Sequence, residues 1–510
     1  MVLLGELSLW IALLMAIWCA VVSLAGGIGG RRELVISGER AAVATLAFTA
    51  LAAAGLWTGL LTRDFSLAYV ASRISANVPD VYAFTAFWGG PEGSMLLWAL
   101  ILALYTALTV WTSRAANRGL MPFVTGTLGV LLALFLGTTA LAANPFARLD
   151  SIPLDGAGML PLLQNPGMAT HPPALYLGLI ATAIPFAFAL GALATRRIDV
   201  EWLSVARRWT LVSWLFLTIG IVLGMWWAYV EPGSVTVWAR DPVANLSLLP
   251  WLTATAFLVA VFRQERRGVL RTWSLALPVA TFVLTIVGAA VARGGIIGNA
   301  HGFARSPVAG VFSAFLVVTI AIGAWLLATR LGHVRAHAWQ PGMAAERRRH
   351  GGYVALAGMV VFLAALAGSG FRREYDVSVT AGQHVEATDP YGGVWRFVNQ
   401  GISKGRSLNR QVTSVTLEAT RNGRPMGLIT SEHRQYFDSH EHPVHEPSSE
   451  AGIRSGPGQD VHVTLAAAGD DSADLRITFI PLMMWVWIGG GMLALGGLMM
   501  AWPRAEGVDA

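Results

Sequence analysis

Charged residues are scarce in this sequence. Of its 510 residues, 13% are charged and 55% are hydrophobic, and the mean hydropathy is +0.56. Soluble globular domains carry about 25% charged residues. A chain of this length with about half that charge is expected in a lipid bilayer rather than in water. The composition therefore argues against an ordinary soluble fold.

Cysteine and lysine are almost absent. The single cysteine, Cys19, lies in an apolar run, so the chain has no disulfide of its own, no C-x-x-C redox or zinc site and no C-x-x-C-H haem-attachment site. Lys404 is the only lysine, so the sequence pI of about 9.8 is due to arginine. The arginines lie mostly in short loops between apolar runs, which favours a membrane's positive-inside bias over a nucleic-acid footprint. We expect membrane lipid as a partner and no nucleic acid.

Long apolar runs are what the sequence has in abundance, and each is long enough to cross a bilayer as a helix. The first run lacks a basic leader, so we expect a retained helix rather than a signal peptide. About eleven spans are predicted, near residues 5–25, 41–61, 93–112, 122–143, 174–194, 209–229, 246–262, 273–292, 308–329, 351–370 and 480–501.

Arginine is distributed unevenly between the two sets of loops. One alternate set, together with the C-terminal tail, holds 19 arginines, whereas the opposite short loops hold six. The positive-inside rule makes the first set cytoplasmic. We therefore predict an N-out, C-in topology, in which the sparse set faces outward. The six outward arginines are Arg63, Arg73, Arg148, Arg240, Arg293 and Arg305.

Residues 371–479 differ in composition from the rest of the chain. Apolar and polar residues alternate from Tyr375, Val415 and Val461, with Gly, Asn and Pro between these stretches. Such alternation predicts short β-strands. The predicted fold class is an all-α polytopic integral membrane protein with a small β-rich extracytoplasmic domain. The predicted domains are a transmembrane domain over 1–370 that carries the unusual outer loops described next, the β-rich domain over 371–479, and a final helix with a cytoplasmic tail over 480–510.

Four unusual loops fall on the predicted outer side. The first begins Trp88-Gly-Gly-Pro-Glu-Gly-Ser, where glycines allow close approach to the backbone and tryptophan offers a flat apolar face. The second carries His171 before two prolines, and neutral imidazole is a good axial haem ligand. The fourth carries His301 between two arginines. Two histidines above one aromatic wall would suit six-coordinate haem iron.

The third loop is rich in tryptophan. It holds Trp226, Trp227 and Trp238, followed by Arg240 and Asp241. The tryptophans would form an aromatic wall on which a porphyrin stacks, and Arg240 would pair with a haem propionate. An interfacial aromatic belt, with Asp241 capping the next helix, is the simpler interpretation. A polar cavity or channel mouth would also collect such groups. The residues alone leave these interpretations open.

In this order, the loops resemble the CcmF-type cytochrome c haem lyase family (also known as CcmF/CycK/NrfE), within a haem-handling superfamily named for its Trp-rich WWD loop. The similarity runs nearly from end to end of the chain, and its joint pattern is more specific than any single piece. The matching segments are 64–72, 88–98, 165–173, 293–301, 432–436 and 481–491.

The resemblance implies haem attachment in a bacterial cytoplasmic (inner) membrane. Haem b would be the substrate, held at the outer face by His171 and His301 as axial iron ligands. Trp88, Trp226, Trp227, Trp238 and Asp241 would form the cradle, with Arg240 and Arg293 near the propionates. The implied partners are a haem chaperone of the CcmE type, a C-x-x-C-H apocytochrome c and a thiol-reducing CcmH-type subunit.

The chain also departs from the family pattern. The family writes its Trp-rich loop roughly as W-G-G-x-W-x-W-D-P-V-E-N, whereas here Arg240 replaces the tryptophan before the aspartate and Ala244 replaces the glutamate. Val259 and Leu356 stand where the family has two haem-ligating histidines within the membrane, so no transmembrane haem is predicted. About four family helices are replaced by residues 331–350. The chain is thus expected to be a shortened, diverged member.

Two other functions remain open: a haem-binding or haem-delivery protein without ligation activity, and a transporter without haem. The predicted spans hold essentially no Asp, Glu or His, which counts against an ion-coupled transporter. Three further histidines in 440–445 have the side chains of a metal site, but their place in an exposed loop favours ordinary surface residues.

Overall fold

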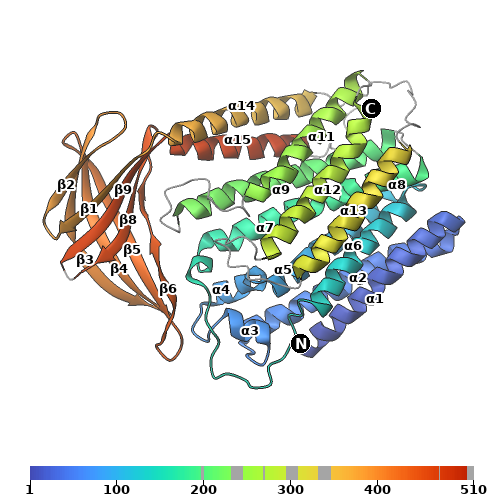
Figure 1. The fold of residues 1–510 in the computed structure, drawn as a ribbon, viewed down its shortest axis with the longest axis horizontal. Helices are drawn as coiled ribbons and strands as arrows, with labels where there is room; N and C mark the ends of the chain where they lie inside the picture. Colours follow the sequence, from blue (N-terminus) through green and yellow to red (C-terminus); the bar gives the residue numbers. More distant parts are fainter. Residues whose placement is uncertain are drawn as a thin grey trace, which may run out of the picture.

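The structure is a computed structural model. It describes residues 1–115, 117–196, 200–230, 245–267, 270–294, 308–330, 346–469 and 471–501. Long helices pack side by side, and a domain of β-strands lies at one end of them (Figure 1). The long helices are α1 (Val2–Gly29), α2 (Arg32–Leu61), α5 (Pro91–Ser113), α6 (Met121–Leu141), α7 (Pro166–Ala181), α8 (Ala183–Thr195), α9 (Val200–Val230), α11 (Leu248–Arg267), α12 (Arg271–Gly294), α13 (Val308–Arg330), α14 (Glu346–Ser369) and α15 (Met483–Ala501).

Within the described residues, ten segments are long and apolar enough to cross a membrane, with α7 and α8 forming one of them over Ala169–Thr195. The apolar part of α11, Leu248–Gln264, is slightly shorter. Each of the eleven predicted spans falls on one of these helices. The prediction of a polytopic helical membrane protein is therefore confirmed.

Glycine allows the closest helix contacts. A Cβ on Gly178 of α7 would lie 2.5 Å from the backbone nitrogen of Leu217, and one on Gly220 of α9 would lie 2.7 Å from the Cα of Leu175. In a membrane, such small residues let backbones approach and gain dispersion energy where no hydrophobic effect operates. They hold α7 tightly against α9, which positions the site described below.

The β-rich domain has two antiparallel sheets, ordered β1-β9-β8-β7 and β2-β3-β4-β5-β6. The three predicted strand regions fall on β1, β4 and β8, so the predicted β-rich domain is confirmed. Its core packs Trp395, Phe397 and Phe479 between the sheets. The strands are β1 (Arg373–Thr380), β2 (His384–Thr388), β3 (Val394–Ser407), β4 (Arg410–Arg421), β5 (Arg424–Phe437), β6 (Pro443–Glu450), β7 (Gly452–Arg454), β8 (Gln459–Ala468) and β9 (Ser472–Pro481).

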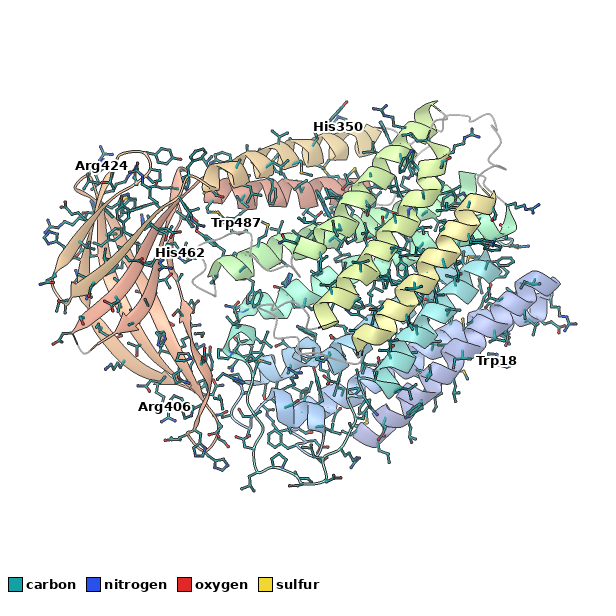
Figure 2. The ribbon with its side chains drawn as sticks, viewed as in Figure 1. Trp18, His350, Arg406, Arg424, His462 and Trp487 are labelled. Carbon is teal, nitrogen blue, oxygen red and sulfur yellow. The ribbon has the colours of Figure 1, made fainter. Side chains whose placement is uncertain are left out.

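The β domain contacts the loops predicted to share one side. Asn77, between the short helices α3 (Ala68–Arg73) and α4 (Asp80–Thr85), donates to the carbonyl of Phe437 at 3.1 Å. Asn409 donates to the side-chain oxygen of Gln164, just before α7, at 3.1 Å. We call this side of the helices the β-domain end. His350 lies at the opposite end of α14 (Figure 2).

Candidate functional site

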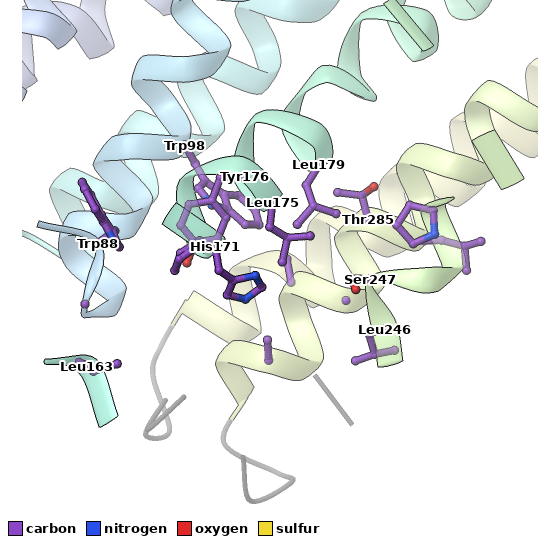
Figure 3. Close-up of a pocket in the computed structure, with 17 residues that line it drawn as sticks. Trp88, Trp98, Leu163, His171, Leu175, Tyr176, Leu179, Leu246, Ser247 and Thr285 are labelled. Carbon is purple, nitrogen blue, oxygen red and sulfur yellow. The ribbon is translucent and has the colours of Figure 1, made fainter. Parts of the chain in front are cut away.

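A cavity opens among α5, α7, α11 and α12 near the β-domain end. Its empty space, counted out to the open mouth, is about 820 Å³, and its walls are mostly apolar. Figure 3 shows His171 and three aromatic side chains among the lining residues. The lining residues are Trp88, Gly89, Trp98, Leu163, His171, Pro172, Leu175, Tyr176, Leu179, Leu246, Ser247, Pro250, Leu284, Thr285, Gly288, Ala289 and Ala292.

His171 projects from the second turn of α7, which begins with Asn165 accepting a hydrogen bond from the backbone nitrogen of Gly167 at 2.7 Å. The ring is 8% exposed, and its Nδ1 lies 2.8 Å from the carbonyl oxygen of Gly220. A carbonyl only accepts, so Nδ1 carries the proton and Nε2 keeps its lone pair in the neutral ring. Metal-binding histidines are oriented by this kind of second contact.

Trp227 and Gly224 of α9 fix the plane of that ring. The Trp227 indole stacks on the imidazole with centroids 6.3 Å apart and planes 13° apart, and its Nε1 donates to the carbonyl of Leu162 at 3.2 Å. A Cβ on Gly224 would lie 2.6 Å from the Cε1 of His171, so only glycine leaves the ring its place. The Trp227 indole therefore packs against one face of the imidazole, and the backbone of Gly224 packs against its Cε1 edge.

Aromatic rings make up another part of the cavity wall. Trp98 and Tyr176 meet edge to face, with centroids 5.5 Å apart, and both are buried. Trp88 lies at the end of the 3-10 turn η1 (Ala86–Trp88). Tyr69 holds this turn by donating to the carbonyls of Ala86 and Phe87 at 2.7 and 3.0 Å. Flat apolar faces beside one imidazole suit a flat, mostly apolar metal-bearing ligand.

The structure brings some of the predicted site residues together. His171 and Trp88 line the cavity, and Trp227 packs behind His171, whereas Trp226 is 36% exposed. Arg293 belongs to the last turn of α12, a helix that lines the cavity through Gly288 and Ala292; its side chain lies outside the described residues. Outside them too are Trp238, Arg240, Asp241 and His301.

Several lining residues were missed by the sequence reasoning. Trp98 and Tyr176 were not assigned to the site, and neither was the face of α12 that carries Leu284, Gly288 and Ala292. The i, i+4 spacing of the α12 residues is a helical-face signal. It did not identify the site, because an apolar stripe in a membrane helix usually faces a neighbouring helix or lipid.

Val259 and Leu356, at which the sequence predicts that in-membrane haem ligands are missing, have exposed side chains. Val259 on α11 is 54% exposed and Leu356 on α14 is 63% exposed. Between α9 and α11, Trp214 and Trp251 stack with centroids 5.8 Å apart. The absence of a transmembrane haem remains a prediction.

The histidines of 440–445 do not gather around a common point in the structure. The rings of His440 and His442 are 6.4 Å apart at the tip of the β5–β6 connection, and His442 Nδ1 lies 3.1 Å from an oxygen of Asp438. Within the described part of the chain, no group of three or more His, Cys, Asp or Glu residues is placed to hold a metal.

The end of α9 is locked to the β domain by Tyr229. Its hydroxyl donates to Asp460 at 3.0 Å, and its carbonyl accepts from His462 Nε2 at 3.1 Å. Figure 2 shows His462 and Trp487 near this junction, and the Tyr229 ring lies 5.7 Å from that of Trp487. Burial raises the pKa of the Asp460 carboxyl and lowers the pKa of His462. The helix α9, which carries Trp227 and contacts His171, is therefore anchored to the β domain.

Comparisons with known proteins find similar sequences over the part of the chain that carries this site. A family model described as Cytochrome C assembly protein matches residues 88–293, a range that contains Trp88 and His171. The chain is 40% identical over 341 residues to the cytochrome c-type biogenesis protein ccl1 of Rhodobacter capsulatus, covering 65% of this chain and 51% of that protein. It is also 40% identical over 335 residues to CcmF of Pseudomonas aeruginosa, with the same coverage.

A solved structure of a cytochrome c heme lyase CcmF has the same fold. The TM-score is 0.81 over 98% of both chains, at 24% sequence identity. The chain spans about half the length of the curated relatives it matches.

Proposed function

We propose that the chain is a member of the CcmF-type family of cytochrome c assembly proteins, that it holds haem at its β-domain end, and that it promotes covalent attachment of that haem to a C-x-x-C-H apocytochrome c. The observation that carries the proposal is His171. Its imidazole lies on a cavity wall, and the Gly220 carbonyl fixes the tautomer that an iron ligand needs.

The cavity lining suits haem as a substrate. Trp88, Trp98 and Tyr176 offer apolar ring faces to a porphyrin, and His171 offers an imidazole beside them. His301 is the proposed second axial ligand. The rest of the proposed cradle is Trp226, Trp227, Trp238 and Asp241, with Arg240 and Arg293 for the propionates.

The reaction needs positioning more than acid–base chemistry. Each reduced cysteine thiol adds across one haem vinyl group, so a carbon–sulfur bond forms at one vinyl carbon and the thiol hydrogen goes to the other. The addition is redox-neutral overall. Holding the iron through His171 while the peptide approaches would convert a bimolecular encounter into an effectively unimolecular step. This is the contribution expected of the chain itself.

The proposed partners follow from that chemistry. Haem must arrive from a carrier, for which a haem chaperone of the CcmE type is proposed. The apocytochrome thiols must be kept reduced, which is the proposed task of a CcmH-type subunit. The arginine distribution favours an extracytoplasmic β-domain end, which supports the proposal that the reaction takes place on the outer face of a bacterial inner membrane.

Haem delivery without ligation is the second candidate. Arg240 and Ala244 depart from the family's Trp-rich loop. A more polar loop would bind haem less tightly and so favour its release to another protein. A direct assay separates the two functions. The full chain in detergent is given reduced haem and a reduced C-x-x-C-H apocytochrome, and covalent haem is measured after denaturing electrophoresis.

The ligation proposal predicts haem that stays on the apocytochrome with the wild-type chain. The product should be lost when both apocytochrome cysteines are changed to serine. Haem that binds the chain yet never becomes covalent, with every proposed partner supplied, would contradict ligation and favour delivery.

A further inference from the structure

Arg73, in the last turn of α3, is a partly buried cation whose Nε makes no hydrogen bond. Its side chain is 24% exposed, and its Nε is shielded from solvent and meets no acceptor. The nearest anion is Glu92, whose Oε2 lies 3.9 Å from Arg73 Nη2, beyond hydrogen-bond distance. That Glu92 oxygen is also buried and receives no hydrogen bond. The two side chains are close, but neither satisfies the other.

Such an arrangement is costly for a guanidinium. Arginine carries five N–H donors, and the Nε–H of Arg73 has lost its contact with water without gaining an acceptor in the protein. The Tyr69 ring, 5.8 Å from Arg73 Cζ, supplies a weak cation–π contact but no acceptor for these N–H groups. A buried polar group left unsatisfied in this way calls for an explanation, and a bound anion is one.

The position of Arg73 relates it to the cavity. A Cβ on Gly90 would lie 2.6 Å from Arg73 Nε, so the guanidinium rests against the backbone of the turn that follows Trp88. Trp88 and Gly89 of that turn line the cavity. The hydroxyl of Tyr69, one helical turn before Arg73, holds the same turn through the carbonyls of Ala86 and Phe87. Arg73 therefore packs against the turn whose Trp88 and Gly89 line the cavity.

We propose that Arg73 binds a carboxylate of the ligand in this cavity, namely a propionate of haem. The proposal rests on the proposed haem function and adds a residue to it. A guanidinium pairs with a carboxylate through two parallel N–H···O bonds, and the exposed quarter of the Arg73 side chain is where such a pair would form. The apolar face of the macrocycle would lie toward the aromatic wall, and a propionate would have to extend past Gly89 to reach Arg73, which lies outside the cavity lining.

Glu92 tunes this site. Its carboxylate, in the first turn of α5, offsets part of the positive charge of Arg73 and competes with an incoming carboxylate. Removing the Glu92 charge should therefore strengthen binding of an anionic porphyrin. A purely structural Arg73–Glu92 pair makes the opposite prediction, because breaking it would weaken the site for every ligand.

The test compares haem with haem dimethyl ester, which has the same macrocycle and iron but no carboxylate. Dissociation constants for both are measured by absorbance titration of the purified full chain. The wild type should prefer haem to the ester. Arg73→Gln should weaken haem binding on the order of tenfold and leave ester binding unchanged. Glu92→Gln should increase the preference for haem, and Arg73→Lys should keep part of it.

Arg148→Gln is the matched control, because Arg148 lies on an exposed loop at the same end of the molecule. An equal loss for haem and ester in Arg73→Gln would show a structural role and overturn the proposal, as would unchanged haem affinity. If the wild type binds neither porphyrin, the proposed function itself fails. If haem binding depends on His171 but not on Arg73, only the Arg73 proposal fails.

Discussion

The Nδ1 atom of His171 lies 2.8 Å from the carbonyl oxygen of Gly220, and this contact joins α7 to α9 at the cavity wall. The carbonyl belongs to Gly220 of α9, whose missing side chain lets α7 approach, since a Cβ there would lie 2.7 Å from the Cα of Leu175. The orientation of the His171 ring therefore depends on how α7 packs against α9, so changes in this packing should alter haem binding.

Gly224→Ala should disturb His171 directly. The added Cβ would lie 2.6 Å from the imidazole Cε1, so the ring or the helix must move, at a cost of about 1 to 3 kcal/mol. We expect weaker haem binding and a lower melting temperature, measured by absorbance titration and thermal unfolding in detergent. Gly491→Ala on α15 is the control, since nothing lies within 4 Å of its added Cβ. Equal behaviour of the two variants would contradict the packing described for His171.

Trp227→Leu should weaken haem binding, because Trp227 packs against the ring of His171. The indole is 5% exposed, stacks on His171 and donates to Leu162, so its loss leaves a cavity and an unpaired carbonyl. The expected destabilisation is about 2 to 4 kcal/mol, with a change in the spectrum of bound haem. Trp111→Leu, at a 73% exposed position on α5, should change neither quantity. An unaltered haem spectrum in Trp227→Leu would argue against a positioning role.

The membrane-spanning helices were predictable because hydropathy is a local property. Each apolar run, such as 93–112, must form its hydrogen bonds within itself in lipid, whatever its neighbours are. The β-strands after Tyr375, Val415 and Val461 were predictable for a similar reason, because alternation reports one buried face. His171 was identified by its local motif.

The cavity was only partly predictable. Trp98 and Tyr176 face it because α5 and α7 pack at a particular depth and rotation, which no local pattern states. The junction of Tyr229 with Asp460 joins residues 231 positions apart in the chain. Such contacts depend on tertiary packing, so a single sequence does not reveal them.

The junction between α9 and the β domain should be sensitive to pH through His462. Burial lowers the pKa of this histidine below its ordinary 6.5, so the folded protein prefers the neutral ring that donates to Tyr229. The stability it contributes is present above pH 6.5 and is lost as pH falls from there through the folded-state pKa. The loss reaches at most about 1.4 kcal/mol per pH unit.

The neighbouring carboxyl of Asp460 titrates with the opposite sign. Burial raises its pKa, so its contribution is present below its unfolded pKa of about 3.9 and is lost as pH rises through the folded value. Comparison with His462→Gln isolates the histidine. Between pH 7.5 and 5.5, the melting temperature of the wild type should fall more than that of His462→Gln. His384→Gln, at an exposed position on β2, should follow the wild type; a wild-type slope equal to that of His462→Gln would refute the assignment.

The central claim is that His171 ligates the haem iron at the β-domain end. The most direct measurement is the absorption spectrum of the purified chain with haem, for the wild type and for His171→Gly with and without added imidazole. We predict that His171→Gly loses the histidine-ligated spectrum and that imidazole restores it by occupying the vacated space. Identical spectra for the wild type and His171→Gly, with no effect of imidazole, would contradict the account.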